Sequence, residues 1–432
     1  MEGFSVFAYV AILLLAGLFS TRLMRLLKLP NVTGYIITGI LFGPFVLGLF
    51  FHNFTMDGIK NGPIFKYVQS LGWISQVALG FIAFSIGSSF RVSTIKSLGK
   101  RVLIITIFEA LGGSLIVIAG LLVAHALFPE QVPMELVLTL GAIAAATAPA
   151  ATLMVIKQYR ARGKLVDTLL PVVALDDAVA LILFAVLFQI ATTIAGGGEF
   201  SAYKMIAKPL IEIALSLAIG SVLGLFISWM NRYFKSRNNR LAFCIFTVFA
   251  ALGFYILFRQ PYMGEFELSS LLICMMAGAF YASLRHDSGP TLDVLERFTS
   301  PVYMMFFIIS GASLDLSIFF SDKGFVVLAI AGTYVVCRVI GKYGGAFAGA
   351  SLTRCEPEVR NYLGLTLAPQ AGVAIGLATT ASTLFNGHES GAMILAVILT
   401  STLVYELIGP MVSKFALQKA GQIPMDRPVS SR

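Results

Sequence analysis

The feature that most constrains this chain is a succession of long apolar stretches separated by short polar connections. The hydrocarbon core of a bilayer is about 30 Å thick, and an α-helix of about 20 apolar residues crosses it. Apolar stretches of about this length recur from the first residues almost to the last. The sequence therefore predicts an all-α polytopic membrane protein.

Composition agrees with this prediction. The 432 residues are 57% hydrophobic and only 12% charged, whereas soluble domains carry about 25% charged residues. No soluble domain and no glycine-rich nucleotide fingerprint occur, so we expect no cofactor and no nucleotide-binding regulatory domain. We identify about thirteen candidate spans, with soft boundaries, at approximately 6–24, 32–51, 73–90, 102–128, 135–156, 165–195, 205–231, 241–258, 269–284, 298–319, 324–352, 361–384 and 391–413.

The net charge of +9 reflects topology rather than nucleic-acid binding. Most of the 31 lysines and arginines lie in the odd-numbered connections between spans and in the C-terminal tail. Because positive residues accumulate in cytoplasmic connections, this distribution predicts a cytoplasmic C-terminus and an N-terminus outside. The expected surroundings are a lipid bilayer, with the cell membrane as the location and no nucleic acid as a partner.

Two spans contain a proline at a similar place: the fifth at Pro149 and the twelfth at Pro369. A proline inside a helix removes a backbone hydrogen bond, and lipid tolerates the freed groups only beside protein or a cavity. The two spans are seven apart, which is an odd number, so they cross the membrane in opposite directions. Paired discontinuous helices in inverted halves are typical of the binding site of a secondary transporter. Spans 1–6 and 8–13 would be the two repeats, with span 7 as a linker.

Among the ionisable residues within the spans, where charged side chains usually have a function, we single out five as candidates. They are Glu109 in the fourth, Asp176 and Asp177 in the sixth, and Arg338 and Lys342 in the eleventh. Counted from the predicted cytoplasmic edge, Asp176 and Lys342 are each about 18 Å deep, so we expect them to pair, with Arg338 as the competing partner. For Glu109 we expect a structural ion pair with Arg338, because their spans occupy related places in the two halves.

Adjacent residues of a helix point about 100° apart, so one cation cannot pair equally with both aspartates. If Asp176 meets Lys342, Asp177 can face a cavity, and the cluster still lacks one positive charge. A proton or a metal ion can supply it, and competition between the two is the basis of antiport. The Thr147 hydroxyl and the carbonyls beside Pro149 are hard oxygen ligands suited to an alkali cation. We therefore predict a Na⁺ site formed by Asp177, Asp176 and Thr147.

Four segments together resemble the second branch of the monovalent cation/proton antiporter superfamily. They are "LKLPNVTGYIITGILFGP", "ATAPAATLMVI", "VALDDAVALILFAV" and "RVIGKYGG", and the Asp-Asp pair is typical of the bacterial Na⁺/H⁺ antiporters of that branch. The resemblance implies a thirteen-helix fold with crossed discontinuous helices, a homodimer, and an elevator movement of the core. It implies Asp177 as the main ion-binding carboxylate and Asp176 as the proton carrier that pairs with a cation of the eleventh span. Many relatives have a basic residue where this chain has Gln370.

The resemblance also implies a division of the chain into domains. Dimerisation helices would occupy 1–101 and 235–322, and core helices would occupy 102–195 and 323–417. A linker helix would lie in 196–234, and a short cytoplasmic tail in 418–432.

Other functions fit the residues less well. An intramembrane aspartyl protease needs its two acids on different helices, and the histidines lack a His-Glu-x-x-His context, so we expect no enzyme. A cation channel is a weaker alternative, because inverted interrupted helices and opposed charges favour alternating access. Within the antiporters, K⁺/H⁺ exchange is the nearest alternative to Na⁺ (or Li⁺)/H⁺ exchange.

Overall fold

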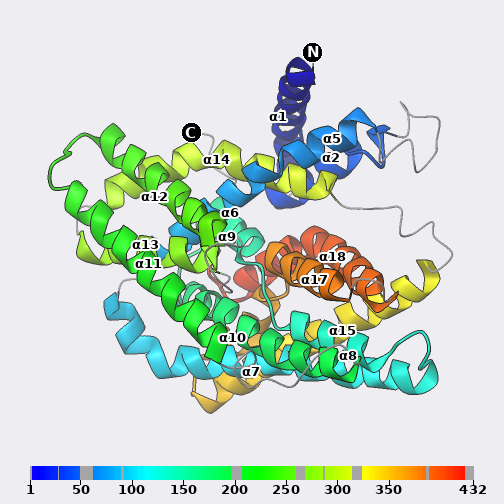
Figure 1. Cartoon of the computed structure of the whole chain (residues 1–432). Helices are drawn as coiled ribbons and strands as arrows, with labels where there is room; N and C mark the ends of the chain where they lie inside the picture. The colour runs from blue at the N-terminus through cyan, green and yellow to red at the C-terminus, as the bar shows by residue number, and fades with distance from the viewer. Residues whose placement is uncertain are drawn as a thin grey trace. The chain divides into compact units, whose positions relative to one another are not determined.

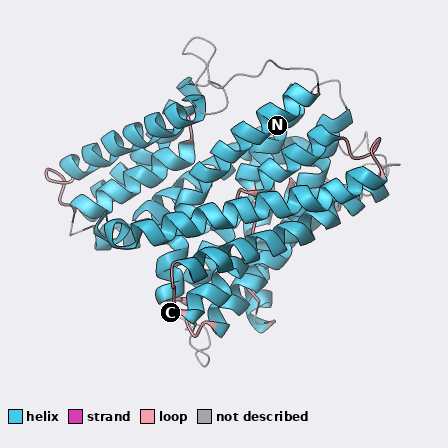
Figure 2. Cartoon of the chain, turned by 90° about the horizontal axis from the view of Figure 1, so that it is seen from below, coloured by secondary structure: helices cyan, strands magenta, loops and turns pink. Residues whose placement is uncertain are grey.

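The structure, a computed structural model, describes residues 2–27, 29–48, 62–88, 92–195, 207–258, 268–285, 288–313, 324–385 and 389–423. Within these ranges the chain is helical with short connections, and it contains no strand (Figure 2). Eight of the described helical segments are long and apolar enough to cross a membrane, and four shorter apolar helices accompany them. The prediction of an all-α polytopic fold is confirmed, and the count of thirteen spans stays a prediction.

The helices form two compact units, each of which is described by itself. The first unit contains α1 (Glu2–Leu26), most of α2 (Asn31–Phe42), α5 (Pro63–Ser70), α6 (Gly72–Ser88), α11 (Lys208–Met230), α12 (Arg237–Phe258), α13 (Ser270–Leu284) and α14 (Gly289–Ala312). The second contains most of α7 (Val92–Leu127) and all of α8 (Met134–Ala144), α9 (Pro149–Tyr159), α10 (Lys164–Ile194), α15 (Gly324–Leu352), α16 (Pro357–Thr366), α17 (Gly372–Leu384) and α18 (Glu389–Lys419).

Glycines bring helices of the first unit into backbone contact. A Cβ at Gly39 of α2 would meet the backbone of Ala312 in α14 at 2.8 Å, and one at Gly278 of α13 would meet that of Ser88 in α6 at 2.9 Å. Small residues allow this approach, which is how membrane helices pack where lipid provides no hydrophobic driving force between them. α11 packs in the same way, through Gly224 against α13. Its predicted role as a linker stays a prediction.

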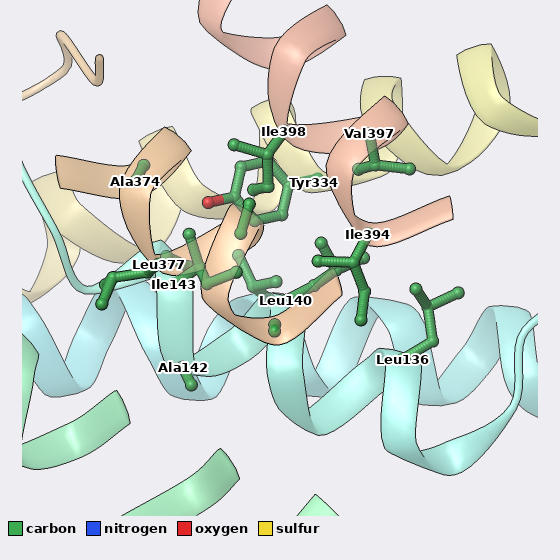
Figure 3. Close-up of a cluster of buried hydrophobic side chains, with 14 of the residues drawn as sticks. Leu136, Leu140, Ala142, Ile143, Tyr334, Ala374, Leu377, Ile394, Val397 and Ile398 are labelled. Carbon is green, nitrogen blue, oxygen red and sulfur yellow. The ribbon is translucent and has the colours of Figure 1, made fainter. Parts of the chain in front are cut away.

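The second unit repeats one pattern of helices twice. A long helix, an interrupted helix and another long helix occur as α7, α8–α9 and α10, and again as α15, α16–α17 and α18. In Figure 1, α17 and α18 run side by side. Buried side chains of α8, α15, α17 and α18 pack together in one cluster (Figure 3), which includes Leu140, Tyr334, Leu377 and Ile398.

Both interruptions lie at the prolines of the fifth and twelfth spans. α8 ends at Ala144 and α9 begins at Pro149, and Ala148 between them is extended with φ −101° and ψ 108°. A residue before proline is driven out of the helical region, whereas proline fits the first turn of the helix that follows. The second interruption separates Thr366, the last residue of α16, from Gly372, the first of α17.

One span is longer than hydropathy predicts. The fourth span was expected from residue 102, but α7 already begins at Val92 and includes Lys96, Lys100 and Arg101. A helix satisfies its own backbone hydrogen bonds and can continue into water, while hydropathy detects only its apolar part.

Candidate ion-binding site

The two interruptions are hydrogen-bonded to each other. The amide of Ala148 donates to the carbonyl of Pro369 at 2.9 Å. Gln370 Nε2 donates to the carbonyls of Ile143 and Ala146 at 2.9 and 3.2 Å. Its Oε1 accepts a hydrogen bond from the Tyr334 hydroxyl at 3.0 Å. Backbone groups that the breaks leave free are thus satisfied by protein, as an apolar environment demands.

Arg338 of α15 binds both interruptions. Its Nε donates to the carbonyl of Ala144 at 3.0 Å, its Nη2 to that of Ala146 at 2.7 Å, and its Nη1 to that of Ala368 at 2.7 Å. The guanidinium is fully buried and lies 4.8 Å from the centroid of the Tyr405 ring. The C-terminal ends of helices carry partial negative charge, so Arg338 compensates the ends of α8 and α16. Among the described residues, Arg338 has no carboxylate partner.

The predicted ion pair between Glu109 and Arg338 is wrong. Glu109 Oε2 instead lies 2.7 Å from Lys342 Nζ, and both side chains are fully buried. Arg338 and Lys342 lie on the same face of α15 and differ in depth by only about 6 Å, which did not identify the partner of Glu109. The backbone carbonyls at the two interruptions explain why Arg338 does not pair with Glu109. Only the planar fork of arginine reaches several of these carbonyls at once.

Gly112 of α7 and Gly341 and Gly345 of α15 bring the two helices into close contact, which we call the glycine seam. This seam places Glu109 against Lys342. A Cβ at Gly112 would lie 2.5 Å from the carbonyl oxygen of Gly341, and one at Gly345 would lie 2.8 Å from the Cα of Glu109. The two backbones are therefore in direct contact at the turn that carries both charges. The glycines of "GKYGG" are what allow this approach.

Lys342 also connects α10 to the first interruption. Its Nζ donates to the Thr147 hydroxyl at 2.7 Å and lies 3.4 Å from both carboxylate oxygens of Asp176. Thr147, Asp176 and Lys342 are all buried. Of the two candidate cations, Lys342 is thus the one in contact with Asp176.

Asp177 is the second acid of α10. It lies one residue beyond Asp176 and is 8% exposed. Its Oδ1 is buried and has no hydrogen-bond partner among the described residues, and the same holds for both carboxylate oxygens of Glu109. Buried polar atoms without partners are unfavourable, so both acids have capacity to accept a proton or a cation.

The donor set suits an alkali cation better than a resident transition metal. In the described part of the chain, no three His, Cys, Asp or Glu side chains are grouped as a metal centre would need. Carboxylate, hydroxyl and carbonyl oxygens are present instead, at Asp177, Asp176 and Thr147. Hard cations prefer oxygen ligands, so Na⁺ as a transported substrate fits these residues.

The charges of the site do not balance. Glu109, Asp176 and Asp177 are buried acids, and Lys342 is the one cation within ion-pair distance of any of them in the described residues. Arg338 is occupied by carbonyls. Buried charges have to be compensated, so the acids require protons or added cations.

Tyr334 and the way Gln370 is held were not predicted from the sequence. A signal for Tyr334 was present, because it precedes Arg338 by four residues and Lys342 by eight, and so shares their helical face. The sequence contained no comparable signal for the two carbonyls that accept from Gln370 Nε2, which lie more than two hundred residues away on α8 and the connection after it.

Comparisons with known proteins bear on the family and the fold. The family model described as "Sodium/hydrogen exchanger, transmembrane" matches residues 10–415. The chain is 24% identical to the Na(+)/H(+)-K(+) antiporter GerN of Bacillus cereus, over 92% of this chain and 94% of that protein. It is 26% identical to sodium/hydrogen exchanger 7 of Arabidopsis thaliana over 73% of this chain, which spans only 27% of that longer protein.

The fold resembles that of a solved transporter. The sodium proton antiporter MjNhaP1 of Methanocaldococcus jannaschii superposes with a TM-score of 0.76 at 17% identity, covering 99% of this chain and 100% of that one. A second structure of the same protein, at pH 8, gives a TM-score of 0.72. These likenesses establish the fold class expected from the two interrupted spans.

Proposed function

Because this chain belongs to the transmembrane sodium/hydrogen exchanger family, whose members are cation/proton antiporters, we propose that it exchanges Na⁺ (or Li⁺) for H⁺ across the membrane. The observation that carries the proposal is the surplus of buried acids around Lys342. Two of them are adjacent on α10, and one has an unpartnered oxygen. Either a cation or protons can occupy such a site, and mutual exclusion couples their movements.

In the proposed mechanism, Asp177 binds the cation together with the Thr147 hydroxyl and the carbonyls of the first interruption. Asp176 carries protons and exchanges them against its contact with Lys342. Arg338 and Gln370 hold the two interruptions together and do not change partners. Uptake of two protons for each Na⁺ released would move net charge, so we expect the exchange to be electrogenic.

The division of the helices into two compact units supports an elevator movement, in which the second unit carries the site and the first is the scaffold. On this proposal the first unit also forms the homodimer. The protein would be a multi-pass protein of the cell membrane, with its N-terminus outside and its C-terminus in the cytoplasm.

A second candidate function is K⁺/H⁺ exchange. The name of the Bacillus cereus relative includes K⁺, and that relative is similar along nearly its whole length. The ammonium/H(+) antiporter subunit AmhT of Alkalihalophilus pseudofirmus, 23% identical over 85% of this chain, makes NH₄⁺ worth assaying as well.

The test is purified protein in liposomes with a pH-sensitive dye inside. Proton efflux should follow added Na⁺ or Li⁺, saturate with cation concentration, and disappear without a counter-gradient. A preference for K⁺ or NH₄⁺ would select the second candidate. Flux that does not saturate and needs no counter-ion would indicate a channel and refute exchange.

A further inference from the structure

Glu109 is the acid of the cluster to which the proposed exchange assigns no role. Its side chain is fully buried, and neither carboxylate oxygen has a hydrogen bond of good geometry among the described residues. Lys342, at 2.7 Å, is its counter-charge. A buried carboxylate with a single partner depends on that partner, because removing it would leave the charge uncompensated.

Two carboxylates share Lys342. The lysine nitrogen is 2.7 Å from Glu109 Oε2 and 3.4 Å from each carboxylate oxygen of Asp176. Coulomb attraction weakens with distance, and both acids lie within ion-pair distance of the lysine. Lys342 therefore has Glu109 as a counter-charge in addition to Asp176.

The backbone prevents Glu109 from drifting away from Lys342. At Gly345, one turn along α15 from the lysine, an added Cβ would lie 2.8 Å from the Cα of Glu109. The distance between the two charges is thus set by packed helices rather than by a mobile loop.

From this geometry we propose that Glu109 is a positioning residue that keeps Lys342 beside the aspartate pair and balances its positive charge. The inference rests on the proposed function and deepens it. Because Glu109 balances Lys342, Asp176 and Asp177 together keep a negative charge available for the transported cation. The lysine stays in place whether or not Asp176 holds a cation.

Removing the charge of Glu109 should therefore weaken cation binding more than it slows transport. In Glu109→Gln, Lys342 would pair fully with Asp176, and the site would lose one negative charge. We expect the KM for Na⁺ to rise at least tenfold while the maximum rate stays within about threefold of wild type. Glu109→Asp keeps the charge at a longer distance, and its KM should lie between the two.

Two controls separate positioning from general stability. Glu356→Gln removes the same charge from a surface ion pair, in which Glu356 lies 3.0 Å from Lys164, and should leave KM unchanged. In a Lys342→Met background, adding Glu109→Gln should raise KM no further, because Glu109 acts through the lysine. A further tenfold rise in that background would overturn the inference.

The experiment measures exchange in liposomes and, on the same preparations, equilibrium binding of radioactive Na⁺ or K⁺. Protein that binds cation but does not exchange it refutes the proposed function, and the dissociation constants of the variants still test Glu109. An unchanged KM and dissociation constant in Glu109→Gln would overturn the inference. If Glu109→Gln does not fold, Glu109→Asp provides the test. A wild-type KM in Glu109→Asp would equally overturn the inference.

Discussion

At the scale of single residues, the buried charges around the two interruptions differ in what satisfies them. Arg338 has three carbonyl acceptors, and Lys342 has two carboxylates and a hydroxyl. Asp177 has an oxygen with no partner in the described chain. Glu109 also lacks hydrogen bonds to its carboxylate oxygens, but Lys342 lies within ion-pair distance of it, whereas no cation among the described residues lies within that distance of Asp177.

The first prediction at this scale concerns Asp177. Asp177→Asn should reduce exchange to below a few per cent of wild type, because an amide cannot alternate between a charged and a protonated form. The melting temperature should not fall, since the substitution removes a buried charge that has no counter-ion of its own. Thermal unfolding and liposome flux on the same sample measure both. Substantial remaining turnover would rule out Asp177 as the shared ligand.

The second prediction concerns Arg338. Arg338→Gln strands buried carbonyls of both interruptions, so the free energy of unfolding should fall by about 3 kcal/mol or more. The loss should be the same, within about 0.5 kcal/mol, in a Glu109→Gln background, because the two residues share no partner. Chemical denaturation of the four proteins measures this. Recovery of stability in the double variant would mean that Glu109 and Arg338 do interact.

At the scale of helices, the site depends on two devices: prolines that interrupt helices, and glycines that let helices touch. The prolines were visible in the sequence, and the interruptions lie where they predicted. The glycines were equally visible, but which helix each one faces depends on packing between segments far apart in the chain. For that reason the ion-pair partner of Glu109 was predicted incorrectly.

The third prediction tests the glycine seam. A Cβ at Gly345 would collide with the backbone of Phe108, so Gly345→Ala should separate α7 from α15 and destabilise the protein by about 1–3 kcal/mol. Gly344→Ala is the matched control, because nothing lies within 4 Å of its added Cβ. Alanine there should stabilise slightly, since it favours helix over glycine. Equal melting temperatures for the two variants would show that the helices can adjust.

At the scale of the whole molecule, the site depends on a repeated pattern of helices: a long helix, an interrupted helix and another long helix. It brings the ends of four half-helices together, and it places acids from one half beside a lysine from the other. A chain with this arrangement can bind a cation in the middle of a membrane-spanning unit.

The fourth prediction is the response of the whole transporter to voltage. If two protons enter for each Na⁺ that leaves, 100 mV acting on the one net charge is worth about 2.3 kcal/mol. The Na⁺ gradient that the protein sustains should then change about fiftyfold. Flux in liposomes clamped by K⁺ and valinomycin gives the null point. A null point at equal Na⁺ and proton gradients, whatever the voltage, would show one-for-one exchange.

By itself the sequence determined the membrane class, the helical fold, the two interruptions and the residues that could carry charge into the membrane. These follow from hydropathy, proline chemistry and the cost of buried charge, which are local properties of the chain. Only the tertiary structure decided that Glu109 faces Lys342 and that Arg338 binds carbonyls instead of an acid. Residues one turn apart share a face and differ in depth by only about 6 Å, so the contact between α7, α8 and α15 distinguishes their partners.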